Sequence, residues 1–259
     1  MSIISVRSSR IVVAIASIVT AASTLLAQSP QRSDQSAAIT GTGEASMTGT
    51  NPGTKGTASM ISPSPGSPLG YHVVAYQPHN PQDVRVDVSL SRQQVYAMEG
   101  DRCLMAAACC VGELEKPTPK GRFKITERIS DKRSDEYGYQ VNNGTITPCN
   151  ASMCHGTYVG YPMPYWCGFM PGYGFCEGYV WPAPHTHGDI RLDKQAAPRF
   201  FEIVQVGTPV NIAETQPEDV TVGRTVQRPD DFKNPDPPAA YMISPGPFQK
   251  PPGKLLIVQ

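Results

Sequence analysis

The chain has 259 residues, and its 26 prolines and 23 glycines leave much of it unsuited to a packed core. Its 22 lysines and arginines balance 22 aspartates and glutamates. Loss of the N-terminal segment described next would leave 20 basic against 22 acidic residues, a balance that gives no reason to expect nucleic-acid binding.

The N-terminal segment has the pattern of an export signal. Arg7 and Arg10 precede an apolar run, residues 11–27, which ends in small residues before polar Gln28. The pattern predicts that residues 1–27 are removed and that the protein is exported to the periplasm or cell envelope. The alternative is an uncleaved membrane anchor. The run is at the short limit for a spanning helix, which favours no stable membrane insertion after signal removal.

Two segments are poor in large apolar side chains. Residues 28–70 are dominated by Ser, Thr, Gly, Ala and Pro, and this composition predicts a disordered linker, because little burial would offset the entropy of ordering. Residues 214–259 are Pro-rich and polar and predict an extended, disordered C-terminal tail. Its apolar end, residues 255–258, is suited to docking on another surface.

Residues 71–213 behave like one domain, with mostly the periodicity of strands. Apolar and polar side chains alternate along residues 84–90, which is typical of a half-buried strand, and residues 94–98 continue the pattern. Residues 99–101 predict a turn. An apolar run of small residues covers 104–111, and alternation returns at 122–126.

One helix is predicted after Asp193, which is a suitable N-cap residue. Ala197, Phe200, Phe201 and Val204 then recur at helical spacing and form one apolar stripe. Pro198 is compatible only with the first turn, so the helix is expected to begin there.

A hairpin is predicted around Pro171-Gly172, with strands at 163–169 and 174–180. Symmetric pairing about this turn would place Cys167 opposite Cys176, at a separation compatible with a disulfide. The chain has seven cysteines, a number that favours disulfides over metal thiolates in an exported protein and leaves at least one thiol unpaired.

Four motifs occur in one order within residues 84–212. They are Pro117-Thr118-Pro119-Lys120-Gly121-Arg122-Phe123, Glu136-Tyr137-Gly138, Met163-Pro164-Tyr165-Trp166 and Thr186-His187-Gly188-Asp189-Ile190-Arg191-Leu192. The series resembles the L,D-transpeptidase catalytic-domain family, bacterial enzymes that cross-link peptidoglycan. The resemblance implies a mainly β fold, a mixed β-sandwich with one packed helix, here flanked by disordered tails. It also implies peptidoglycan stem peptides as partners and no cofactor.

Both signature catalytic positions differ from that family. Its last motif reads Ser/Thr-His-Gly-Cys-Ile-Arg-Leu, so Asp189 stands where the nucleophilic cysteine is expected, and Cys176 stands where the family places a histidine. A carboxylate is a weak nucleophile toward an amide, so the leading hypothesis is a cell-wall protein with impaired or lost catalysis. Arg191, Trp166, Tyr179 and Trp181 are the predicted substrate-binding residues.

Two alternatives stay open. Cys176 as nucleophile, His187 as base and Asp189 as orienting acid would reproduce a Cys-His-Asp triad with exchanged positions, and so an active L,D-transpeptidase. His185, His187 and Asp189 would instead lie on one face of an extended segment and could bind a metal ion.

Overall fold

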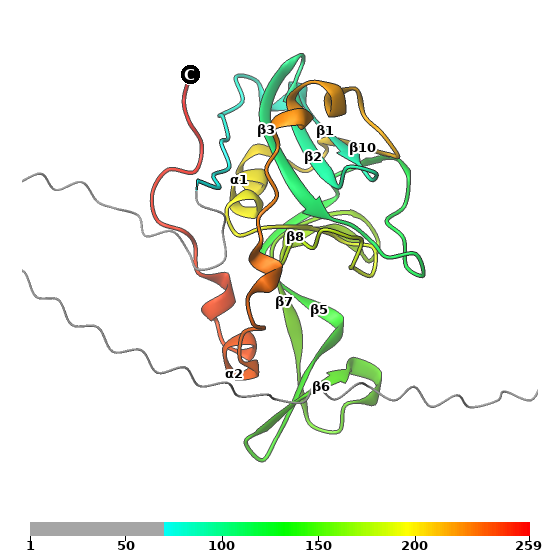
Figure 1. The fold of residues 1–259 in the computed structure, drawn as a ribbon. Helices are drawn as coiled ribbons and strands as arrows, with labels where there is room; N and C mark the ends of the chain where they lie inside the picture. Colours follow the sequence, from blue (N-terminus) through cyan, green and yellow to red (C-terminus); the bar gives the residue numbers. More distant parts are fainter. Residues whose placement is uncertain (1–69) are drawn as a thin grey trace, which may run out of the picture. The chain divides into compact units, whose positions relative to one another are not determined.

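A computed structural model of the chain describes residues 70–259 (Figure 1). The predicted export signal and nearly all of the predicted linker fall outside the described residues. In the described part of the chain, no helix is both long enough and apolar enough to cross a membrane.

Ten strands form one mixed sheet, in the order β4-β10-β1-β2-β3-β9-β8-β7-β5-β6. Their bounds are β1 Val84–Ser89, β2 Gln94–Glu99, β3 Arg102–Cys110, β4 Gly121–Lys124, β5 Glu127–Asn142, β6 Thr145–Asn150, β7 Thr157–Met170, β8 Tyr173–Glu177, β9 Ile190–Leu192 and β10 Pro209–Ala213. The mainly β fold with one packed helix is confirmed.

The sheet has two parallel pairs, β1 with β10 and β8 with β9. The alternating valines of β1 are buried, as predicted, but its polar residues Asp87 and Ser89 are buried too. Ser89 Oγ donates a hydrogen bond to Asp219 Oδ2 (2.9 Å), and Tyr96 OH on β2 donates to Asp219 Oδ1 (2.8 Å). β1 is therefore covered on both faces, because the C-terminal segment packs over the face predicted to be exposed.

The predicted helix is α1, Ala196–Ile203. The carboxylate of Asp193 accepts hydrogen bonds from the backbone N–H groups of Gln195 (2.9 Å) and Ala196 (3.2 Å), so it caps the first turn. The ring of Phe200 packs against Phe175 on β8, with centroids 4.6 Å apart. The helix thus holds the sheet at the strand that carries Cys176.

The β7–β8 hairpin turns at Pro171-Gly172, as predicted, with Gly172 at a φ of +78°. The predicted Cys167–Cys176 disulfide is wrong. Cys167 pairs with Phe175, and the register shifts between Gly168 and Met170, where a bulge adds a residue to one strand. A slip of one residue points the two thiols to opposite faces, and both cysteines are free.

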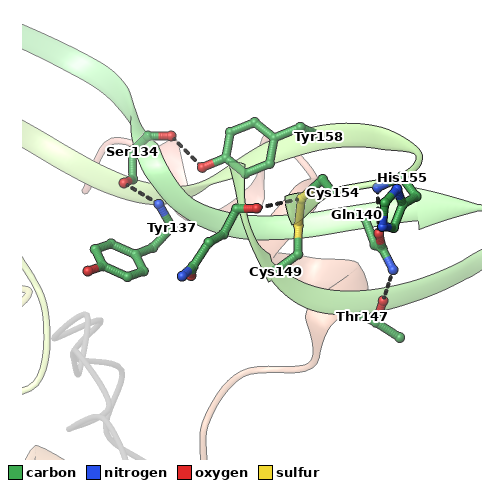
Figure 2. The surroundings of a disulfide bond; sticks show 9 residues. Ser134, Tyr137, Gln140, Thr147, Cys149, Cys154, His155 and Tyr158 are labelled. Carbon is green, nitrogen blue, oxygen red and sulfur yellow. Dashed lines mark hydrogen bonds between the residues drawn. A yellow bond between two sulfur atoms is a disulfide. The ribbon is translucent and has the colours of Figure 1, made fainter. Parts of the chain in front are cut away.

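β5, β6 and β7 form an arm that projects from the rest of the sheet (Figure 1). A disulfide between Cys149 and Cys154 closes its far end. Near it, Tyr158 OH on β7 donates a hydrogen bond to the carbonyl oxygen of Ser134 on β5 (3.0 Å), as Figure 2 shows. β5 and β6 were not among the predicted strands.

The C-terminal segment, residues 214–259, contradicts the prediction of a disordered tail. It contains η3 Pro217–Val220, η4 Val222–Thr225, η5 Asp231–Lys233, α2 Ala239–Ile243 and η6 Gly246–Phe248. Arg133 on β5 donates hydrogen bonds to the carbonyl oxygens of Met242 and Ser244, and Ile257 N donates to Ala75 O (2.9 Å). Side chains of the domain therefore hold a segment that has little apolar pattern of its own, and its apolar end docks as expected.

Candidate functional site

The candidate site lies where the parallel strands β8 and β9 meet. Cys176 on β8 pairs with Arg191 on β9, so both side chains point to the same face of the sheet. The neighbouring residue Phe175 points to the opposite face and packs in the core with α1. Asp189 comes directly before β9, and its charge acts on the Cys176 thiol. Cys176, Asp189 and Arg191 are thus brought together.

Cys176 is buried, with 4% of its surface exposed. Burial raises the pKa of its thiol well above the ordinary value, and the negative charge of Asp189 raises it further, against a smaller lowering by Arg191. The thiol is therefore protonated at neutral pH. Since the thiolate is the nucleophilic form, this environment opposes the chemistry that a triad requires.

Asp189 is held by the backbone around it. Its Oδ1 accepts a hydrogen bond from Gly174 N (3.3 Å), and its carbonyl oxygen accepts one from Thr186 Oγ1 (2.6 Å). Burial raises the pKa of its carboxyl to about 6, although the bond from Gly174 and the charge of Arg191 both lower it. A partly buried, hydrogen-bonded carboxyl group thus lies where the sequence predicts the nucleophile.

His187 lies apart from these two residues. Its Nε2 is 3.7 Å from Glu113 Oε1, and its ring packs edge-on against Tyr137, with centroids 5.2 Å apart. It makes no hydrogen bond with Cys176 or Asp189, and about half of its side chain is exposed. Within the described residues, the base of the predicted triad is therefore not aligned with its nucleophile.

The alternative of a metal site at His185, His187 and Asp189 is contradicted within the described residues. The ring of His185 stacks on Trp181, with centroids 4.3 Å apart, while His187 turns to Glu113. No three His, Cys, Asp or Glu side chains in residues 70–259 gather so that they could hold a metal ion. His187 and Asp189 do not share one face because Gly188 lies between them with a φ of +111°. The alternation of side chains along an extended strand ends at this residue.

The predicted substrate-binding aromatics have different surroundings. Trp166 is only 4% exposed and its Nε1 donates to Glu127 Oε1 (2.7 Å), so the ring is a packing element with little surface for a ligand. Tyr179 OH donates to the carbonyl oxygen of Pro235 (2.9 Å). Trp181 lies against His185 and also against Phe232, at 5.4 Å between centroids. The C-terminal segment therefore already contacts Tyr179 and Trp181.

Sequence reasoning missed the neighbours of His187. Lys116 Nζ donates to Tyr137 OH (2.9 Å), which places a lysine, a tyrosine, a histidine and Glu113 in one exposed cluster. Tyr137 belongs to the Glu136-Tyr137-Gly138 motif, which was the only signal for it. Its contact with His187 depends on where β5 lies relative to residue 187 in the folded chain. The order of motifs in the sequence does not predict this distance.

A model of the YkuD family, the L,D-transpeptidase catalytic domain, matches residues 83–212. The match covers half of the chain, and the chain therefore belongs to the L,D-transpeptidase catalytic-domain family. No curated protein matches the chain.

Several solved structures are similar to this chain. An L,D-transpeptidase (Yku) from Stackebrandtia nassauensis is 17% identical, with a TM-score of 0.39 over 55% of this chain and 60% of its own. An L,D-transpeptidase from Mycobacterium smegmatis is 13% identical, with a TM-score of 0.40 over 51% of this chain and 58% of its own. The catalytic domain of an E. faecium L,D-transpeptidase is 22% identical, with a TM-score of 0.38 over 52% of this chain and 100% of its own. The chain thus spans about three-fifths of the first two proteins.

Proposed function

We propose that this is an exported protein that associates with peptidoglycan at the cell wall and whose transpeptidase chemistry is impaired or lost. Family membership supports the peptidoglycan target. The observation that supports the loss is the partly buried carboxyl of Asp189 at the predicted nucleophile position, hydrogen-bonded to Gly174 N. Export is supported by the charged and apolar pattern of residues 1–27.

Acyl transfer needs a nucleophile that attacks the stem-peptide carbonyl and a base that takes its proton. The carboxyl of Asp189 would form a mixed anhydride, which is short-lived in water. The Cys176 thiol is buried and its pKa is raised, and His187 contacts Glu113 instead of that thiol. Neither residue meets the requirements of a cysteine enzyme in this arrangement.

The rearranged triad is the second candidate, and the closeness of Cys176 to Asp189 is what favours it. It would require His187 to leave Glu113 and reach the thiol. A carbapenem that acylates nucleophilic cysteines separates the two candidates. After incubation, the intact mass of the protein is measured, and the modified residue is located by peptide mapping.

We expect no stoichiometric adduct with the unmodified protein at neutral pH. The control is the double substitution Asp189→Cys with Cys176→His, which restores both family residues and should gain an adduct at position 189. The single Asp189→Cys variant should react more slowly, because it has no upstream imidazole. A stoichiometric adduct on Cys176 of the unmodified protein would establish the rearranged enzyme.

A further inference from the structure

Residues 226–236, which we call the strap, cross the loop that follows β8 (orange in Figure 1). Arg228 fastens the strap to the domain. Its guanidinium donates to the carbonyl oxygens of Cys109 (2.9 Å) and Trp181 (3.0 Å), and also to those of Arg92 (3.2 Å) and Gln93 (3.1 Å). One side chain therefore links the strap to β3, to the loop before β2 and to the loop after β8.

Beyond Arg228, the strap contacts three consecutive residues. Tyr179 OH donates to Pro235 O, Val180 N donates to Asp231 Oδ1 (3.0 Å), and the Trp181 ring packs against Phe232. These contacts use a main-chain donor, a phenol and an indole. The same kinds of groups bind an extended, carboxylate-bearing peptide or a sugar ring.

We propose that the strap is a removable cover, occupying within the chain the Tyr179–Trp181 surface that binds peptidoglycan when the strap lifts. The proposal rests on the peptidoglycan association proposed above. In the covered state, the Asp231 carboxylate stands where a ligand carboxylate would accept from Val180 N, and the Phe232 ring stands where a ligand would stack on Trp181. Only molecules with an open strap can bind, so the apparent affinity for the wall equals the intrinsic affinity multiplied by the open fraction.

Carboxyl groups in the strap and in the domain that it covers make its closure sensitive to pH. Asp231 faces Asp193 at the start of α1 and Glu177 at the end of β8. The other charged or titratable groups around them are Tyr71, Lys194, Arg199, Arg228 and Asp230. Burial and this mutual repulsion raise the pKa of Asp231 to about 6 and that of Glu177 to about 7.

The sign follows from the direction of these shifts. The closed strap holds the protons of Asp231 and Glu177 more tightly than an open strap in water would. Closure is therefore fully favoured at low pH and is weakened as the pH rises through about 6 to 7. Since Asp231 is only partly buried, we expect about a tenfold fall in the closed-to-open ratio between pH 5 and pH 8.

The test uses the full mature chain and two measurements. Hydrogen exchange at the Val180 amide reports opening directly, because that N–H is bonded to Asp231. Pelleting with purified peptidoglycan sacculi reports binding. Phe232→Ala removes the ring that covers Trp181 and should speed exchange and tighten binding by about twofold to tenfold, the range that one aromatic pair supplies.

Two further variants complete the design. Gln227→Ala changes an exposed strap residue with no hydrogen bond in the described structure and should behave like the unmodified chain. Asp231→Asn keeps an acceptor for Val180 N but removes the charge. The unmodified chain should bind sacculi about tenfold more tightly at pH 8 than at pH 5, and the variant should show a smaller change, because only Glu177 of the two carboxyl groups still titrates.

Each outcome decides something. Faster Val180 exchange together with tighter pelleting supports the cover. Faster exchange with unchanged pelleting overturns it and leaves the peptidoglycan association standing. If no variant pellets at either pH, the association itself fails and the cover fails with it. Unchanged exchange in Phe232→Ala overturns the strap as the element that shields this surface.

Discussion

Asp189 is the residue that the sequence motif places at the predicted nucleophile position. A cysteine at this position would present a thiolate, whereas a carboxyl group accepts the Gly174 N–H and is partly protonated near neutral pH. The predicted nucleophile position therefore supplies a structural hydrogen bond in this protein. If the role of Asp189 is structural, its substitution should change the stability of the folded protein.

The pH dependence of stability tests this role. Burial raises the pKa of Asp189 from an ordinary value of 3.8 to about 6 in the folded protein. The contribution of Asp189 to stability is therefore fully present below about pH 4 and is lost as the pH rises through about 6. Asp189→Asn, which still accepts from Gly174 N, should stabilise the protein at pH 7 by about 1–2 kcal/mol and change little at pH 4.

The measurement is urea unfolding at the two pH values. Asp101→Asn is the matched control, because Asp101 is an exposed carboxylate in the turn after β2. A stabilisation by Asp189→Asn that is equal at pH 4 and pH 7 would show that the carboxyl charge has no part in it.

At the scale of elements, two strands of the β5–β6–β7 arm, β5 and β6, are only partly buried or exposed along their whole length. Both β5 and β6 lack fully buried residues, and the far end is closed by the Cys149–Cys154 disulfide. The disulfide closes a very short loop, so the chain-entropy account assigns it about 2 kcal/mol. That contribution is local, because α1 and its aromatic contacts lie at the other end of β7.

Replacing both Cys149 and Cys154 by Ser should loosen the arm without unfolding the domain. We expect faster hydrogen exchange in residues 143–160 and unchanged protection of α1. Reduction of the unmodified protein is the parallel experiment, and it should have the same local effect. Loss of protection in α1 at the same time would mean that the arm is part of the folding core.

How well an element could be predicted depended on whether its pattern is local. β1 to β4 and α1 follow from apolar spacing, and the β7–β8 turn follows from Pro171-Gly172. The register of that hairpin did not follow, because a bulge near Phe169 shifts the pairing by one residue. β5 was missed because neither of its faces is fully buried, so its sequence has no apolar alternation to detect.

At the scale of the whole molecule, the C-terminal segment is the largest difference from expectation. It lacks apolar periodicity, and its order comes from contacts with distant residues, such as Asp219 with Ser89 and Arg228 with main-chain carbonyl oxygens. Hydrogen bonds between buried polar groups order a chain, as apolar packing does. Polar residues that make such bonds follow no regular spacing that could be recognised in the sequence. The candidate site was predicted only in part for the same reason. The motifs pointed to Cys176 and Asp189 but gave no sign of the strap beside them.

A truncation after residue 213, the predicted domain boundary, tests this integration. Without the segment, the hydroxyls of Ser89 and Tyr96 lose Asp219, and the covered face of β1 meets water. We expect the melting temperature to fall by more than about 10 °C, which corresponds to several kcal/mol for a domain of this size. A deletion of residues 28–60 is the control for chain shortening. An unchanged melting temperature after truncation at residue 213 would show that residues 214–259 do not stabilise the domain.

The pairing of β1 with β10 also fixes the order in which the domain can be completed. β1 is among the first strands to leave the ribosome, yet its parallel neighbour is the last, and Ile257 must then reach back to Ala75. Contacts between such distant parts of a chain form slowly, because a long loop must close before they contribute. The native sheet therefore cannot be completed until β10 has been synthesised, so β1 stays without its parallel partner during most of the synthesis of the domain.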